Sequence, residues 1–414
     1  MLINATNKTG MGVQYALTPT QDLRVGAGIQ VRSLDTDAIT GAGNGQEVTV
    51  LGRVMAAWVG IELSGANALV RIGASGFIIS TGEGIFLDGR NPTVVNAGTI
   101  QAANDGIRAM SGATTGTVRI TNSGAIFSEM DAVYIDTQQN TILRNSGLIV
   151  STTGDSFDGS VRVDKVFNTG VMDGGIDLQT DNDLYDGRGG IVFGTILGGS
   201  GNDRFVLGSS AETIDGGTDI DTLDFRSAGA VKVALDGSFI NAGAAAKGDT
   251  YAGMENIFGS LTGADSLAGN IEANLIRGFG GNDSLFAVDG NDTLTGGAGV
   301  DTISTGFGIN QIRFNALSER GDVLTNFDAS NDEIWIKASG FGGNLGAPGM
   351  LAAGRFTSGT DKQADDAGDR FIYNEVSDRL YFDRDGTGTG FAAVLLCVND
   401  GAFGVMTNAD IFIF

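Results

Sequence analysis

The sequence of 414 residues contains no histidine and a single cysteine, Cys397. Without histidine the chain cannot bind haem through an imidazole, form a Ser-His-Asp or Cys-His catalytic group, or carry the HExxH motif of zinc proteases. One cysteine excludes a disulfide framework and zinc fingers. These absences remove many classes of enzyme and metalloprotein.

Basic residues are also scarce, because 25 Lys and Arg face 49 Asp and Glu, which gives a net charge of −24. Binding of nucleic-acid phosphates requires a basic surface, so we expect no nucleic-acid partner. Acidity of this degree destabilises a compact chain by self-repulsion unless cations neutralise it. It indicates either solubility alone or bound metal, and the positions of the aspartates must decide.

Long apolar runs are missing as well. The longest tract is AAVLLCV at 392–398, well short of the roughly 18 residues of a membrane span, so we expect none. The N-terminal sequence MLINATNKTG lacks the basic-then-apolar order of a secretory signal peptide. Proline is rare at 3 residues, while 67 glycines and 42% hydrophobic residues are typical of neither collagen nor a disordered tail, and they indicate a folded protein.

The first half of the chain repeats the phrase Asn-x-Gly-x-aliphatic, at 96–100, 122–126, 145–149 and 168–172. Self-similarity at such a period marks stacked repeat architectures rather than one compact core. Each repeat contains short β-branched or aliphatic stretches separated by Gly, Asn, Ser and Thr, which is the chemistry of strands and turns. The pattern predicts a parallel β-helix with one repeat per coil.

Three columns of stacked residues follow from this repeat. Aliphatic side chains would point inward, glycines would permit a tight corner, and asparagine amides would form a ladder in which each bonds its neighbours above and below. The predicted members are Ile78, Ile100, Ile126 and Ile149 in the core, Gly76, Gly98, Gly124, Gly147 and Gly170 at the corner, and Asn96, Asn122, Asn145 and Asn168 in the ladder.

A fourth column is acidic: Glu83, Asp105, Asp131 and Asp155 precede the next strand in consecutive repeats. Stacked carboxylates can bind a cation, or a pair can perform acid-base chemistry on a polysaccharide. Acidic residues are also common in solvated turns for local hydrogen-bonding reasons, and this interpretation is favoured here.

From Gly198 the period changes to nine residues. The segment GGSGNDRFV at 198–206 matches G-G-x-G-x-D-x-U-x, in which U is a large aliphatic or aromatic residue. Two degenerate nines follow, and six more run without a gap from 260 to 313. The eighth residues of these six should fill a core: Leu267, Ile276, Leu285, Leu294, Ile303 and Ile312.

Two nines make one coil, so residues 18 apart should stack. Between stacked turns, carboxylate and carbonyl oxygens would surround a hard cation with flexible geometry, which favours Ca²⁺ over zinc or copper. The predicted stacks are Asp203 on Asp221, Asp265 on Asp283 on Asp301, and Asn274 on Asp292 on Asn310.

These nines make the chain resemble RTX proteins, the calcium-binding β-roll family exported by type I secretion, and the part from about 190 to 414 is similar to the β-roll region of serralysin proteases without their protease half. The resemblance implies several Ca²⁺ ions and, besides the stacked side chains, further metal ligands from the turns. These are Gly198, Gly199, Gly201, Gly216, Asp219, Gly263, Gly278, Gly280, Gly281, Gly290, Gly296, Gly297 and Gly299. Glu212, Asn274 and Asn310 depart from the motif and should weaken the sites that they border.

The sequence thus predicts an all-β protein, in which a right-handed parallel β-helix continues into a calcium-binding parallel β-roll with a C-terminal β cap. The predicted divisions are an N-terminal segment or cap at 1–47, the β-helix at 48–187, a first RTX block with a spacer at 188–259, a second RTX block at 260–313, and the cap with the secretion signal at 314–414.

By the same resemblance we expect an extracellular or cell-surface protein, secreted by type I machinery without an N-terminal signal peptide. The end NADIFIF is similar to the uncleaved signal of such proteins, although a last edge strand has the same sequence character. Folding on extracellular calcium would give a rigid rod, so we expect no catalysis and a surface lattice, filament or adhesin subunit.

Self-association is expected if the first coil near residues 20–50 is open, and not if residues 1–47 fold over it. The alternative function is an extracellular polysaccharide lyase or epimerase that uses the β-helix.

Overall fold

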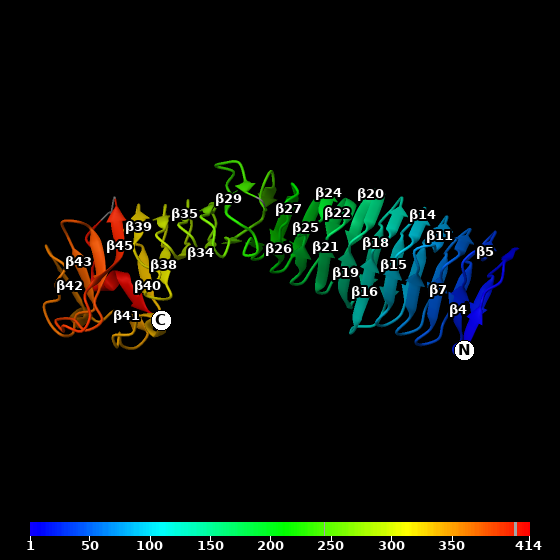
Figure 1. Cartoon of the computed structure of the whole chain (residues 1–414), viewed down its shortest axis with the longest axis horizontal. Helices are drawn as coiled ribbons and strands as arrows, with labels where there is room; N and C mark the ends of the chain where they lie inside the picture. Colours follow the sequence, from blue (N-terminus) through cyan, green and yellow to red (C-terminus); the bar gives the residue numbers. More distant parts are fainter. Residues whose placement is uncertain (244, 401–403) are drawn as a thin grey trace. The chain divides into compact units, whose positions relative to one another are not determined.

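The structure is a computed structural model that describes residues 1–243, 245–400 and 404–414. Residues 244 and 401–403 of the predicted blocks 188–259 and 314–414 therefore lie outside the described residues. The chain divides into two compact units, which are described separately (Figure 1). The first unit comprises Met1–Asp221 with Asp249–Met254, and the second comprises Thr222–Gly248 with Glu255–Phe414.

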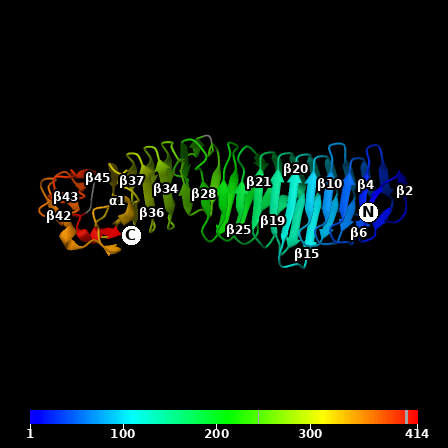
Figure 2. The same cartoon turned by 60° about the horizontal axis from the view of Figure 1, so that its bottom comes forward.

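The first unit is a parallel β-solenoid whose strands form three columns, and strands of one column lie side by side (Figure 2). The first column contains β1 (Leu2–Asn4), β4 (Asp22–Val25), β7 (Glu47–Val50), β10 (Leu69–Ile72), β13 (Thr93–Asn96), β16 (Thr117–Asn122), β19 (Asn140–Asn145), β21 (Asp164–Asn168), β23 (Leu184–Asp186) and β26 (Arg204–Val206). The second contains β2 (Lys8–Gly10), β5 (Gln30–Ser33), β8 (Arg53–Ala56), β11 (Phe77–Ser80), β14 (Thr99–Ala102), β17 (Ala125–Ser128) and β24 (Ile191–Phe193).

The third column contains β3 (Tyr15–Leu17), β6 (Ile39–Gly41), β9 (Ile61–Leu63), β12 (Ile85–Asp88), β15 (Ile107–Ser111), β18 (Val133–Thr137), β25 (Thr195–Ser200), β27 (Thr213–Thr218) and β31 (Thr250–Ala252). Two longer strands, β20 (Leu148–Asp158) and β22 (Val171–Asp177), run through both the second and the third column. The predicted parallel β-helix is therefore present.

Alternating burial explains why these segments stack. In β7, β10 and β13 every second side chain is buried, which is the pattern of a strand with one face on a core. Buried residues at one position pair from coil to coil and continue without a break from the asparagine repeats into the first nine-residue repeat. They are Val70, Val94, Ile120, Leu143, Val166, Tyr185 and Phe205.

The predicted aliphatic and asparagine columns are confirmed. Ile78, Ile100, Ile126 and Ile149 pair in register and are fully buried. The amide Nδ2 of each ladder asparagine donates to Oδ1 of the next, at 2.8 Å from Asn96 to Asn122, 2.8 Å from Asn122 to Asn145 and 3.0 Å from Asn145 to Asn168. Because an amide carries both a donor and an acceptor, this buried ladder satisfies itself.

Close approach explains the corner glycines. A Cβ added to Gly124 would lie 2.1 Å from the carbonyl oxygen of Gly98, and one added to Gly147 would lie 2.1 Å from that of Gly124. Each corner therefore rests directly on the backbone of the corner before it, and any side chain would separate the coils.

Residues 1–47 do not form a separate cap. Strand β1 pairs with β4 and β4 with β7, while β2 and β5 continue to β8, so this segment belongs to the same solenoid as the coils after residue 47. The unit boundary also lies at Asp221, inside the block predicted as 188–259. Apolar side chains in the first coils follow the same inward alternation, as Leu23, Val25 and Val31 show.

The second unit has two columns of mostly parallel strands. One contains β28 (Thr222–Asp224), β32 (Asn256–Phe258), β34 (Leu275–Gly280), β36 (Thr293–Ala298), β38 (Gln311–Phe314), β40 (Glu333–Ile336), β46 (Ile411–Ile413) and β41 (Gly349–Met350). The other contains β30 (Ala242–Gly243), β29 (Val231–Ala234), β33 (Ser266–Ala268), β35 (Ser284–Phe286), β37 (Thr302–Ser304), β39 (Asp322–Thr325), β45 (Val394–Asp400), β44 (Arg379–Phe382), β43 (Phe371–Asn374) and β42 (Phe356–Gly359).

The six predicted core positions of the second repeat block, Leu267 to Ile312, are all buried, so the predicted β-roll core is confirmed. After β40 the sheets are closed by antiparallel pairs, namely β41 on β46, β43 on β44 and β44 on β45, together with α1 (Ala338–Phe341), η1 (Ala353–Arg355) and η2 (Asn408–Asp410). The NADIFIF segment forms η2 and β46, and β46 lies between β40 and β41. None of the helices in the described residues has the length and apolar character that crossing a bilayer takes.

The asparagine ladder gives a first prediction. Asn122→Ala removes two buried amide bonds and should lower the free energy of unfolding by about 1–3 kcal/mol. Asn140→Ala, at an exposed position of the neighbouring coil, is the matched control and should change it by less than about 0.5 kcal/mol. Denaturant unfolding measures both, and equal effects of the two variants would contradict a ladder that stabilises the coils.

Candidate calcium-binding turns

Each glycine-rich turn of the nine-residue repeats lies against the turn one coil earlier. Gly217 and Gly297 have left-handed backbone angles, with φ of 101° and 103°. A Cβ on Gly217 would lie 2.1 Å from the carbonyl oxygen of Gly199, and one on Gly297 would lie 2.1 Å from that of Phe279. Carbonyl oxygens of one turn are thus directed at the backbone of the next.

The acidic side chains of the turns stack as the spacing of 18 predicts. Oδ1 of Asp221 accepts the N–H of Asp203 at 2.7 Å, and Oδ1 of Asp301 accepts the N–H of Asp283 at 2.8 Å. The same bond, at 2.7–3.0 Å, joins Asp265 to Asp283, Asn274 to Asp292, and Asp292 to Asn310. One side-chain oxygen of each acceptor is thereby used by the backbone.

The second carboxylate oxygen has no such partner. Oδ2 of Asp203, Asp283, Asp292 and Asp301 is buried and takes part in no hydrogen bond. These four side chains belong to residues at most 2% exposed. Burial of an ionised carboxylate without a partner is costly, so each oxygen calls for a proton or a cation.

Glycine at the first position lets a carboxylate oxygen and a carbonyl oxygen approach the same part of the turn. The point where a Cβ of Gly198 would lie is 2.4 Å from Oδ2 of Asp203 and 2.4 Å from the carbonyl oxygen of Gly216. The corresponding point at Gly278 is 2.2 Å from Oδ2 of Asp283 and 2.7 Å from the carbonyl oxygen of Gly296. Calcium binds carboxylate and carbonyl oxygens, so this set of donors suits Ca²⁺.

Backbone oxygens must supply much of each coordination shell. Within the described ranges no three or more Asp, Glu or Cys side chains gather closely enough to hold a metal by themselves. Carboxylate and carbonyl oxygens without nitrogen or sulfur suit a hard cation.

Comparison with known proteins agrees with this geometry. Residues 188–223, 261–294 and 277–312 match the family model described as RTX calcium-binding nonapeptide repeat (4 copies). The chain carries RTX calcium-binding repeats. Repeats of this family indicate a secreted calcium-binding β-roll protein. A comparison with curated proteins finds no match.

The predicted turn ligands all lie in or beside the RTX turns. Gly198 and Gly199 lie in β25, Gly216 in β27, Gly278 and Gly280 in β34, and Gly296 and Gly297 in β36, while Gly201, Gly263, Gly281, Gly290 and Gly299 lie in connecting turns. Asp219 is exposed and takes the left-handed angle of the glycine that it replaces, with φ of 81°. Their assignment as ligands stays a prediction.

Three predicted ligands already have other hydrogen-bond partners within the chain. The oxygens of Asp265 accept the N–H and hydroxyl of Ser260 at 2.7–3.1 Å. Oδ1 of Asn274 accepts the N–H of Asn270 at 2.8 Å. Nδ2 of Asn310 donates to Oδ1 of Asp332 at 2.9 Å. Asp265, Asn274 and Asn310 are therefore the weakest members of the predicted set.

The stacks also include residues that the sequence analysis missed. In the stacks, the coil after Asp301 contributes Asp322, and the coil after Asn310 contributes Asp332. The two coils before Asp203 contribute Asp183 and Asp164. Glu212 stacks on Asp249 in the same way. Their separations of 19, 20, 21, 22 and 37 residues differ from 18. The signal that could have found them is an aspartate two residues before a buried apolar residue, as in Asp183-Leu-Tyr185.

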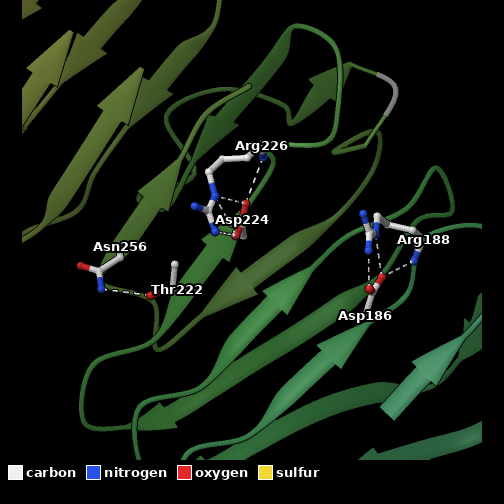
Figure 3. Close-up of polar contacts among 6 residues, drawn as sticks. All are labelled: Asp186, Arg188, Thr222, Asp224, Arg226 and Asn256. Atoms are coloured by element: carbon white, nitrogen blue, oxygen red, sulfur yellow. Dashed lines mark hydrogen bonds and ion pairs between the residues drawn. The ribbon is translucent and has the colours of Figure 1, made fainter. Parts of the chain in front are cut away.

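Two other aspartates each form an ion pair with an arginine two residues further along the chain. Oδ1 and Oδ2 of Asp186 accept hydrogen bonds from Arg188 Nε and Nη2 at 2.8 and 2.6 Å, and Asp224 binds Arg226 in the same way (Figure 3). Such forked pairs satisfy both carboxylate oxygens. These residues are therefore not calcium ligands in our assignment.

Two members of the acidic column of the β-helix, Glu83 and Asp105, are buried rather than solvated, whereas Asp131 and Asp155 are half-buried. Glu83 and Asp105 are 8% and 2% exposed, and Nη1 of Arg108 lies 3.7 Å from the first and 3.5 Å from the second. Oδ1 of Asp131 accepts the N–H of Asp155 at 2.8 Å. Burial raises the pKa of Asp105 to about 6, although Arg108 opposes this shift.

Titration of the turn carboxylates depends on whether metal is bound. Without a cation, burial raises the pKa of Asp283 to about 7, with a further contribution from the charge of Asp301. Burial likewise raises the pKa of Asp292 to about 7. A bound cation favours the charged form of these carboxylates and therefore lowers their pKa values instead of raising them.

This gives a second prediction, on pH. In EDTA the folded pKa values of about 7 exceed unfolded values of about 3.9. The folded state then binds more protons, so stability is greatest below about pH 4 and is lost as pH rises through about 7. With saturating calcium the ligands are ionised in the folded state, so stability should fall as pH falls.

Thermal unfolding between pH 5 and pH 8 measures both dependences. The unfolding temperature should fall with pH in EDTA and rise with pH in calcium. Parallel curves in the two buffers would show that these carboxylates do not bind the ion.

Proposed function

We propose that this protein is a secreted structural component of a cell surface whose RTX turns fold around extracellular Ca²⁺. The observation that carries the proposal is the set of buried carboxylate oxygens without hydrogen-bond partners, on Asp203, Asp283, Asp292 and Asp301. These oxygens lack the interaction that would compensate for their burial, and a divalent cation supplies it.

Calcium supplies folding free energy in this account. Stacked carboxylates repel one another and lose hydration on burial, so the metal-free turns are unstable. Modules with weak calcium sites, of about 10⁻⁴–10⁻³ M, are saturated outside cells and not in a cytosol poor in calcium. The β-roll half of the chain therefore stays unfolded before export and folds after it.

Export by type I machinery is part of the proposal and is supported by the RTX repeats. The proposed signal, the NADIFIF segment, is an interior strand of the folded cap, because Ile411 pairs with Ile334 and Ile413 with Gly349. In the unfolded chain the same segment would be accessible to a transporter, so recognition must precede calcium-dependent folding.

Self-association would use the edge of the first coil. Within the described residues, β1, β2 and β3 each pair with a strand on one side, and Leu2, Met11 and Val13 beside them are 57%, 71% and 38% exposed. Open strand edges pair with further strands. A different, unpaired strand edge of a second copy can pair there, and repetition of this head-to-tail contact would extend the solenoid into a filament or lattice.

An alternative is a polysaccharide lyase or epimerase. It is favoured by a cavity of 330 Å³ on the outer face of the β-helix, lined in part by Tyr134, Asp136, Asp158 and Gln179. Burial raises the pKa of Asp158 to about 6, which suits a general acid. Turnover of alginate or pectin that is lost in Asp158→Ala would replace the structural proposal, which expects no turnover.

The third prediction concerns folding. Circular dichroism of the full chain at pH 8, where the EDTA form is least stable, should show partial loss of strand signal in EDTA and recovery in millimolar calcium. Magnesium at the same concentration is the control, because its strict octahedral geometry and tightly held waters fit these carbonyl-rich turns poorly. Unchanged strand content after chelation would contradict the proposed coupling.

The fourth prediction concerns assembly. Electron microscopy of the calcium-loaded protein should show filaments or sheets, and Leu2→Lys should abolish them by placing a charge at the edge. Val161→Lys is the matched control, since Val161 is 52% exposed in the same unit and lies away from β1–β3. Single particles in every sample would rule out assembly through this edge.

A further inference from the structure

A nine-residue turn without a single glycine precedes the first RTX repeat. Leu178–Asp186 lies on Gly198–Val206 residue by residue, because Asp177 pairs with Leu197, Thr180 with Ser200 and Tyr185 with Phe205. The family match begins only at residue 188. The backbone of this segment nonetheless follows the course of the repeat above it.

Two of its residues adopt backbone angles that the repeat reserves for glycine. Gln179 and Asp181 have φ of 71° and 85°, at the positions of Gly199 and Gly201, which have φ of 97° and 123°. Residues with a Cβ are strained in this conformation. The neighbouring structure must therefore hold them there, and Nε2 of Gln179 bonds Oδ1 of Asp158 at 2.7 Å on the outer side.

The strained angles direct two carbonyl groups at the next turn. A Cβ on Gly199 would lie 2.0 Å from the carbonyl oxygen of Gln179, and one on Gly201 would lie 2.1 Å from that of Asp181. The same relation holds between Gly199 and Gly217, within the matched repeats. The oxygens that line a calcium-binding turn are therefore present here too.

Asp183 takes the aspartate position of this turn. It is 3% exposed, its N–H donates to Oδ1 of Asp203 at 2.8 Å, and its own Oδ1 accepts the N–H of Asp164 at 2.7 Å. Its Oδ2 is buried and has no hydrogen-bond partner. Asp203, Asp283 and Asp301 in the matched repeats have the same buried Oδ2 without a hydrogen-bond partner.

One coil earlier the pattern ends. Oδ2 of Asp164 accepts the N–H of Ser160 at 2.6 Å, and Oδ1 accepts the Ser160 hydroxyl at 3.0 Å, so this buried carboxylate is satisfied without a metal. The first position of the turn is Leu178 rather than glycine, but Ala287 holds the same position before Asp292, whose Oδ2 is likewise without a partner. A side chain there is compatible with such a turn.

We propose that the turns Leu178–Asp183 and Gly198–Asp203 hold a Ca²⁺ ion between them, with Asp183 as its carboxylate ligand and the carbonyl groups of Gln179 and Asp181 among its oxygen donors. This inference rests on the calcium-dependent folding proposed above. It extends the calcium sites out of the RTX motif and into the coils of the β-helix.

The fifth prediction tests this site. Calcium bound per full-length chain is measured at saturation by equilibrium dialysis and elemental analysis. Asp183→Asn should bind one ion fewer than wild type. Asp164→Asn, the matched change in the same stack one coil earlier, should bind as many ions as wild type. Wild-type stoichiometry in Asp183→Asn overturns the inference.

Asp283→Asn, in a matched repeat, separates this inference from the function on which it rests. Loss of ions in Asp283→Asn but not in Asp183→Asn overturns the new site alone, whereas loss in neither overturns calcium binding by the turns as proposed.

If Asp183→Asn does not fold, luminescence of bound Tb³⁺ provides a second test. Tyr185 follows Asp183 by two residues and should sensitise an ion in this turn, so Tyr185→Phe should lower the emission at unchanged stoichiometry. Unchanged emission overturns the inference.

Discussion

The bond between a backbone N–H and a carboxylate oxygen of the next coil is the interaction on which the RTX turns depend. It holds each aspartate in the stack, as between Asp283 and Asp301, and it commits one oxygen while leaving the other buried. The geometry that stacks the turns therefore also creates the need for a cation. Metal binding and coil stacking are consequences of one arrangement rather than two separate properties.

Much of this architecture could be predicted because stacking imposes a period on the sequence. Ile100 and Ile126 pair in register because each coil adds one strand per column, and Leu285 and Ile303 are buried for the same reason. The asparagine ladder was predictable because only a side chain with both a donor and an acceptor can bond identical neighbours on both sides.

The remaining features could not be predicted, because at these positions the backbone follows the repeat although the sequence no longer matches its motif. Gln179 and Asp181 occupy glycine positions, so no motif search finds their turn, and Asp322 stacks at a spacing of 21 residues because the preceding turn is longer. Asp265 matches the motif, yet Ser260 satisfies its carboxylate, which only the three-dimensional arrangement reveals. The place of residues 1–47 in the solenoid was missed because its short strands carry none of the asparagine phrases.

The two kinds of stack in this protein are bonded differently, side chain to side chain in the asparagine ladder and backbone N–H to side chain in the aspartate stacks. Asn122 closes its own chain of hydrogen bonds, whereas Asp283 is left with a buried oxygen that needs a proton or a cation. Asn274 and Asn310 already alternate with Asp292 within one stack. Single-nucleotide exchanges between asparagine and aspartate codons within these stacks can therefore change which coils depend on an ion, which lets evolution tune the calcium requirement of the coils without redesigning their backbone.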